Sequence, residues 1–186
     1  PVHPLYGVKA TPIVQSPPDV WLLGSSSETA KLAAAKGLPY AFAQFINGEG
    51  GEQYMRLYRE RFVPSPYLAE PRAMVAVFAI CAETDEKAEW IAGSLDLTLL
   101  MLEQGMAVNG TPSPEKAAAY SYSPYERKRV ADNRRRMIVG SPARVKDELY
   151  RLSEAYETEE IMLVTITYDF HDKLTSFRLI AEAVWG

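Results

Sequence analysis

The sequence predicts an α/β protein in which parallel strands alternate with helices. Residues 20–45 have the pattern of strand, helix and strand in direct succession, and strands joined by a helical crossover are parallel. Residues 73–81 and 160–167 are two further apolar runs, each followed by a helical pattern. Near-continuous apolar runs are typical of parallel strands that are covered on both faces.

The first strand is predicted at about 20–23, buried on both faces, and it breaks at Gly24 into three serines. Ser25 to Glu28 fit the capping-box pattern, with Ser25 as the N-cap of the following helix. That helix is Ala-rich, covers about 26–36 and ends at Gly37, a residue suited to a left-handed C-cap.

The second strand is predicted at about 40–45. A glycine-rich break follows, and then a helix whose apolar face includes Tyr54, Leu57, Tyr58 and Phe62. The third strand covers 73–81. Either Thr84 or Asp85 is expected to cap the next helix, which runs to Gly105.

Residues 105–136 interrupt this alternation, because they contain three prolines, three tyrosines and a cluster of arginines. We expect an irregular excursion with short helices at about 114–120 and 124–135. The basic residues of 127–136 are interpreted as a solvated helix face. Two functional alternatives stay open for them: holding a cofactor phosphate, or contacting nucleic acid.

The last part of the chain returns to helix and strand. Ser141 is expected to cap a helix that has Pro142 at its first position. A strand follows at about 160–167. The final helix, at about 171–184, is predicted to bury the apolar residues Leu174, Phe177, Ile180, Ala181 and Val184.

Three stretches resemble the bacterial luciferase-like, flavin-dependent monooxygenases. They are Val20 to Phe45, with its Gly-Ser-Ser turn and Gly-Leu-Pro, Arg72 to Glu86, and Ile138 to Asp169, with Ile-Val-Gly-Ser-Pro. The ordered set covers most of the chain. The resemblance implies a (β/α)8 TIM barrel, which typically needs about 250 residues, and the matching stretches belong to its second half.

We therefore expect the 186 residues to form a single partial domain over 1–186. It is the C-terminal half of a barrel, with four parallel strands and their helices, and 105–136 is an insertion. Half a barrel leaves one face of the sheet and two strand edges uncovered. The chain is accordingly expected to self-associate or to pair with the N-terminal half that is missing from it.

Composition narrows the function classes. The net charge of −4 argues against a general nucleic-acid binder, and no apolar run reaches the roughly 20 residues of a membrane span. The single cysteine, Cys81, excludes an intramolecular disulfide and, with no secretory signal at the start, favours a cytoplasmic protein. His3 and His171 are far apart and belong to no Cys or His cluster, so no metal site is predicted.

Active sites of TIM barrels lie at the C-terminal ends of the strands. The Gly24 turn lies at such an end, and the helix N-terminus beyond it can bind an anion, although most serine N-caps bind nothing. The resemblance implies that Ser25, Ser26 and Thr29 contact the phosphate of FMN. The sequence departs from the family at Ser25, where luciferase has a glutamate.

The next strand end offers weaker candidates. By the same resemblance Gln44 and Phe45 lie beside the flavin ring, and Phe45 is equally compatible with a place in the core. Cys81 is interpreted as a small buried hydrophobe.

The resemblance also implies a reaction. Reduced FMN, supplied by a separate reductase, and O2 oxygenate a small organic substrate, and the second oxygen atom leaves as water. A deazaflavin is the alternative cofactor. No catalytic residue is assigned, because the family's polar residues near the ring lie largely in the half that is not matched, and this chain alone is expected to be inactive. A non-catalytic flavin-binding or protein-interaction module is the alternative function.

Overall fold

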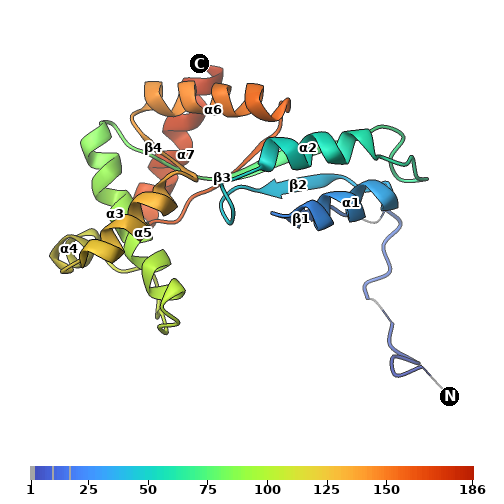
Figure 1. Ribbon diagram of the computed structural model, residues 1–186, viewed down its shortest axis with the longest axis horizontal. Coiled ribbons are helices and arrows are strands. Elements are labelled where there is room, and N and C mark those ends of the chain that lie inside the picture. Colours follow the sequence, from blue (N-terminus) through green and yellow to red (C-terminus); the bar gives the residue numbers. More distant parts are fainter. Residues whose placement is uncertain (1–2, 10, 17) are drawn as a thin grey trace.

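The computed structural model describes residues 3–9, 11–16 and 18–186. Within these residues it contains one five-stranded parallel sheet and seven helices (Figure 1), which confirms the α/β class. The strands are β1 (Leu22–Gly24), β2 (Tyr40–Ala43), β3 (Ala73–Cys81), β4 (Met137–Gly140) and β5 (Ile161–Val164). The helices are α1 (Ser27–Lys36), α2 (Gly51–Glu60), α3 (Asp85–Glu103), α4 (Pro114–Ala119), α5 (Pro124–Arg134), α6 (Pro142–Tyr156) and α7 (Phe170–Trp185).

The long strand β3 organises the sheet. Its residue Val75 pairs with both β2 and β5, and Phe78 pairs with both β4 and β5. A strand has two edges, so β2 and β4 follow each other along one edge of β3 while β5 occupies the other. β1 pairs with β2. The sheet is not closed, which agrees with a partial barrel.

Alternate residues of β3 face opposite sides of the sheet and divide the core into two layers. Val75, Val77 and Ala79 pack on one side, against α1, α2, α6 and α7. Phe78 and Ile80 pack on the other side, mainly against α3. Helices therefore cover both faces of β3, whereas β1, β4 and β5 each pair with one strand only and keep one unpaired edge in the described part of the chain.

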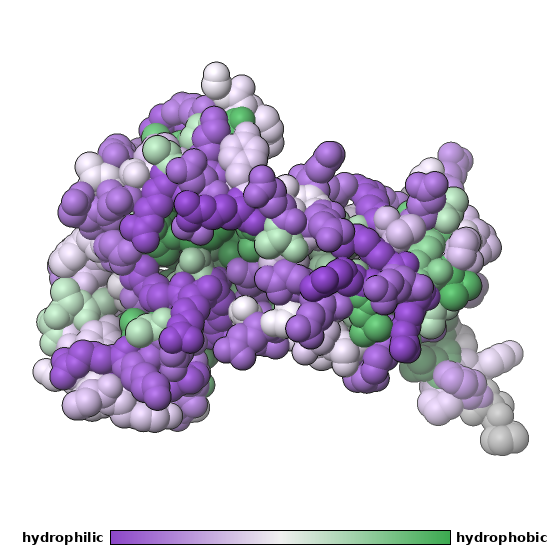
Figure 2. All heavy atoms as spheres, turned by 45° about the horizontal axis from the view of Figure 1, so that its top comes forward, coloured by the Kyte–Doolittle hydropathy of each residue, from purple (hydrophilic) through white to green (hydrophobic). Residues whose placement is uncertain are grey.

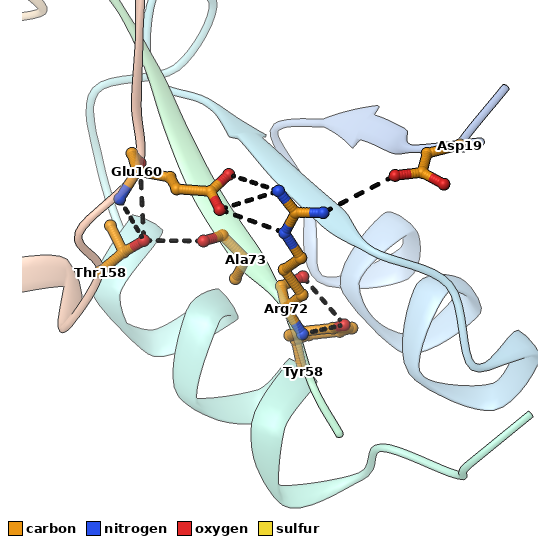
Figure 3. A network of polar contacts seen from close by, with 6 residues as sticks. All are labelled: Asp19, Tyr58, Arg72, Ala73, Thr158 and Glu160. Carbon is orange, nitrogen blue, oxygen red and sulfur yellow. Dashed lines mark hydrogen bonds and ion pairs between the residues drawn. The ribbon is translucent and has the colours of Figure 1, made fainter. Parts of the chain in front are cut away.

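A polar network joins the N-terminal ends of the strands (Figure 3). Arg72, just before β3, donates hydrogen bonds of 2.9 and 3.1 Å to the carboxylate of Glu160, just before β5. Its guanidinium also lies 3.7 Å from the Asp19 carboxylate, and the hydroxyl of Tyr58 on α2 accepts a 3.2 Å hydrogen bond from the backbone N–H of Arg72. This end of the sheet is thus occupied by structural contacts.

The prediction of four strands was wrong by one. The structure adds β4, whose four residues directly follow the arginine-rich segment. Only four residues separate the last arginine from the cap at Ser141, and so short an apolar run gives a weak periodic signal. The two helices predicted within 105–136 are confirmed as α4 and α5, and both contact α3.

The first strand is also shifted from its prediction. β1 begins at Leu22 instead of residue 20 and extends to Gly24. It is not buried on both faces, because Val20 and Leu23 are each more than half exposed. The physical reason is alternation along the strand: Leu22 packs in the layer that contains α1 and α2, so Leu23 faces the other side of the sheet. β2 and β5 are shorter than predicted.

The predicted buried face of the final helix was wrong in part. Ile180 is buried, but Leu174 and Phe177 are exposed. Phe177 lines an apolar cavity of about 440 Å³ together with Ile161 and Leu163 of β5. Figure 2 shows hydrophobic residues (green) reaching the surface between polar regions (purple) on one face of the molecule.

Candidate functional site at the C-terminal ends of the strands

The strands are parallel, so their C-terminal ends at Gly24, Ala43, Cys81, Gly140 and Val164 lie toward one side of the sheet. The turn from β1 into α1 is on this side. Asn47, in the loop after β2, joins the two neighbouring ends, because its Nδ2 donates a 3.3 Å hydrogen bond to the carbonyl oxygen of Ser25.

The helix α1 begins one residue later than the sequence predicted. Ser26 is its N-cap, with extended backbone and a side chain that accepts a 3.4 Å hydrogen bond from the Thr29 N–H. The expected capping box of Ser25 with Glu28 does not form, since Glu28 pairs with Lys31 at 2.7 Å. The reason is that β1 continues through Gly24 and leaves Ser25 in the connection. The C-cap prediction at Gly37 is confirmed.

Ser26 and Thr29 come together at this turn. Their hydroxyl oxygens lie 3.4 Å apart. The Thr29 side chain packs directly over the backbone of Gly24, where an added Cβ would lie 2.6 Å from Thr29 Cβ and Cγ2. Gly24 is therefore required for this close approach, and it fixes Thr29 beside the N-terminus of α1. Ser25 contributes its backbone and a half-buried side chain to the same turn.

Gln44 lies at the end of β2, away from the serine turn. Its Oε1 is buried without a hydrogen-bond partner, and the residue lines a cavity of about 210 Å³ together with Tyr156 and Leu152 of α6. Phe45 faces the other layer, where its ring packs edge-on against Phe78 with centroids 5.4 Å apart. The structure thus brings Ser25, Ser26 and Thr29 together, but within the described residues no hydrogen bond joins the Gln44 side chain to them.

The residues at the C-terminal end of β3 make structural contacts. Cys81 is buried, its backbone N–H donates a 2.9 Å hydrogen bond to Ser176 Oγ, and burial raises the pKa of the thiol to about 11. This agrees with a small buried hydrophobe that is protonated at neutral pH. Thr84 caps α3, as one of the two alternatives predicted. Ser141 makes no side-chain cap on α6, and the Asp85 carboxylate accepts its N–H at 2.6 Å instead.

The arginine cluster is not a fully solvated helix face, so that interpretation was wrong. Arg134 forms a two-pronged pair with Asp96 of α3, at 2.6 and 2.8 Å. Burial raises the pKa of Asp96, and the guanidinium opposes part of that rise. Arg129 pairs with Glu103 at 3.1 Å. The periodic charge of α5 gave no sign of these partners, because they lie on a helix about 30 residues earlier in the chain.

Two structural features would indicate other classes of function: a membrane-spanning helix and a cluster of metal-binding side chains. In the described ranges, none of the helices is both long and apolar enough to cross a membrane. The same ranges hold no group of three or more His, Cys, Asp or Glu side chains arranged to bind a metal ion.

Comparison with known proteins places this geometry in a family. The model of the luciferase-like monooxygenases matches residues 3–159. A Bacillus subtilis protein, YwcH, is 56% identical over 181 residues, which are 97% of this chain and 54% of that protein. The N-acetyl-S-alkylcysteine monooxygenase of the same organism is 33% identical and is matched over 98% of this chain and 54% of its own length.

Solved structures agree. The crystal structure of apo-MsnO8 superposes with a TM-score of 0.82 at 35% identity, covering 96% of this chain and 54% of that one. The oxygenating constituent of 3,6-diketocamphane monooxygenase from Pseudomonas putida, solved with FMN, shares the fold with a TM-score of 0.59 at 18% identity, over 90% and 48% of the two chains. The chain spans about half the length of these relatives. It belongs to the luciferase-like monooxygenase family.

Proposed function

We propose that this chain supplies the phosphate-binding half of a flavin-dependent monooxygenase that uses reduced FMN and O2 on a small organic substrate. The observation that carries the proposal is the β1–α1 turn, where Ser26 and Thr29 present two hydroxyls beside a helix N-terminus. Membership of the family supports the proposed class of reaction.

The turn fits a phosphate group. The first turn of a helix has N–H groups without partners inside the helix, and its end carries about half a positive charge. The hydroxyls of Ser26 and Thr29 can donate to the same anion. The nearest acidic residue in the sequence, Glu28, pairs with Lys31, which lowers its pKa and offsets its charge.

The proposed roles follow from these positions. Ser25, Ser26 and Thr29 would hold the phosphate, and Gln44 would contact the flavin through its unpartnered Oε1. Reduced FMN, when bound, supplies the electrons that activate O2. The protein binds the cofactor, orients it and excludes water. A deazaflavin is the alternative cofactor, and a small organic thioether is a sensible first substrate, given the N-acetyl-S-alkylcysteine relative.

The test is a titration of FMN against Ser26→Asp. We expect the carboxylate to repel the phosphate and weaken binding at least tenfold, or about 1.4 kcal/mol. Ser26→Ala should cost less, because the backbone N–H groups remain. Ser113→Asp, at the N-cap of α4, is the matched control and should leave FMN affinity unchanged. Equal affinity of Ser26→Asp and the unaltered chain would refute the phosphate site.

A non-catalytic flavin-binding or protein-interaction module is the second candidate. It is favoured by the open sheet and by a length of about half that of the relatives. A reductase-coupled assay with a polypeptide that supplies the other half of the barrel separates the two: oxygenation of a thioether by the pair supports the enzyme, and FMN binding without oxygenation by the pair supports the module. Flavin absorbance in the purified protein separates flavin binding from protein interaction.

A further inference from the structure

A polar cavity lies beside the β1–α1 turn that contains Ser25 and Ser26. Its volume is about 690 Å³, and its walls are the loop 46–49 after β2 and residues 128–136 at the end of α5. Asn47 lines this cavity and also donates to the Ser25 carbonyl, so the cavity and the proposed phosphate turn share one residue as a wall. A molecule in the cavity would therefore lie next to a flavin held at the turn.

Cations outnumber carboxylates around the cavity. Lys128, Arg129, Arg135 and Arg136 line it, against Glu49 and Asp132. Such an excess of guanidinium and ammonium groups in a concave, polar site favours an anion, and a guanidinium can bind an oxyanion through two parallel hydrogen bonds.

Two of these cations are already used by the fold. Arg129 pairs with Glu103, and Arg136 donates to Asn133 Oδ1 at 2.6 Å and to the carbonyl oxygen of Ile46. Arg136 also lies 3.8 Å from the Glu103 carboxylate, and burial lowers its pKa. Its Nε is buried without a partner and is closed to solvent, so it does not face the cavity. A guanidinium has five N–H donors, so the two terminal nitrogens of Arg136 keep N–H groups that a ligand in the cavity can meet.

The other two cations are available. Lys128 is exposed and forms no ion pair with any residue that the structure describes. The side chain of Arg135 is 77% exposed, and its ion pair with Asp132 is long, at 3.7 Å. Both are free to turn toward a ligand without breaking a contact of the core.

From these observations we infer that the cavity between loop 46–49 and α5 is a binding site for the oxyanion group, a carboxylate or a phosphate, of a small organic molecule. The half-buried Arg136 lines the site, and the exposed side chains of Lys128 and Arg135 close on the anion. Its placement beside the flavin turn rests on the proposed function, but the binding of the anion does not. The insertion thereby becomes part of a ligand site instead of a solvated appendage.

The experiment titrates inorganic phosphate and acetate into the purified chain by calorimetry. Phosphate is titrated in the Ser26→Asp background, so that the serine turn does not contribute. Adding Lys128→Gln and Arg135→Gln should weaken phosphate binding at least tenfold. The matched control adds Arg56→Gln and Arg178→Gln to the same background. These two arginines are exposed, on α2 and α7, and their substitution should change phosphate affinity less than twofold.

The outcomes separate this inference from the proposed function. The oxyanion site would be overturned if both pairs of substitutions weakened phosphate binding equally. It would also be overturned if the Ser26→Asp chain bound no phosphate. A chain that binds phosphate there but never binds FMN keeps the site and loses the flavin proposal. With Ser26 intact, FMN affinity identifies the molecule whose oxyanion occupies the cavity. A tenfold loss of FMN affinity in the Lys128→Gln, Arg135→Gln variant assigns the cavity to the cofactor phosphate. An unchanged FMN affinity assigns it to a substrate.

Discussion

At the scale of single residues, Gly24 is the most constrained position of the site. Its backbone lies against the Thr29 side chain, and an added methyl group would come within 2.6 Å of two Thr29 carbons. Gly24→Ala should therefore force the β1–α1 turn apart and lower the free energy of unfolding by about 1–3 kcal/mol, as overpacking does. Urea unfolding measures this change.

The matched control for Gly24→Ala is Gly93→Ala. That glycine lies inside α3, and its added Cβ would meet only Ala117 Cβ, at an ordinary 3.7 Å. Alanine is favoured over glycine in helices by up to about 1 kcal/mol, so this variant should be as stable as the original or more so. If Gly24→Ala proves as harmless as Gly93→Ala, the close packing of Thr29 is not what positions the turn.

The sequence predicted the residues of the turn better than their roles. It placed Ser25, Ser26 and Thr29 after the first strand, where they lie, but it assigned the N-cap to Ser25 because Glu28 stands three positions on. The true start of α1 depends on how far β1 pairs with β2, which is a tertiary property. For the cavity beside α5, the sequence identified the basic residues 127–136 and left open that they hold a cofactor phosphate. It did not identify loop 46–49 as the opposite wall, since that loop and α5 meet only in the fold.

At the scale of elements, one acidic side chain makes most of the polar contacts at the start of α5. Glu126 accepts the Ser123 N–H at 2.8 Å and forms a capping box, and it also accepts from Tyr120 and Gln104. These donors lower its pKa from 4.5 to about 2. A lowered pKa in the folded state means that the stabilisation is complete above about pH 4.5 and is lost as the pH falls toward 2.

We therefore predict that Glu126→Gln removes part of the acid sensitivity of the protein. The original chain should lose thermal stability between pH 4.5 and pH 2 more steeply than the variant, and the two melting curves should converge at the acid end. Glu182→Gln, an exposed carboxylate of α7 paired with Arg178, is the control. Parallel curves for Glu126→Gln and the original chain would show that the carboxylate does not stabilise α5.

Element prediction succeeded where one local pattern decides the outcome. The nine apolar residues 73–81 form β3 with the predicted bounds, and the Ser-Pro starts of α4 and α5 were placed correctly. It failed for β4, which is four residues long and is specified by pairing with β3. Leu174 and Phe177 show the same limit, because helical periodicity identifies an apolar face but not whether anything packs against it.

At the scale of the whole molecule, the open sheet is the dominant feature. β1, β4 and β5 each present an unpaired parallel edge in the described structure, and Met162 in the middle of β5 is 47% exposed. The apolar cavity of about 440 Å³ beside α7 adds to this surface. Apolar surface gains about 25 cal/mol for each Å² removed from water, so an uncovered area of a few hundred Å² favours association by several kcal/mol.

The chain is accordingly expected to self-associate at micromolar concentration, with the β5 side covered. Met162→Lys places a charge on this outer strand and should shift the sedimentation profile toward the monomer, as lysines do on natural sheet edges. Leu32→Lys is a close control, because Leu32 is also 47% exposed but lies on α1 and should leave association unchanged. If the original chain is monomeric and binds no hydrophobic dye, the open side of the sheet does not drive self-association. If both lysine substitutions shift the sedimentation profile equally, the shift is an effect of net charge. Addition of a polypeptide that supplies the other half of the barrel should compete with self-association, because it would cover the same side of β5.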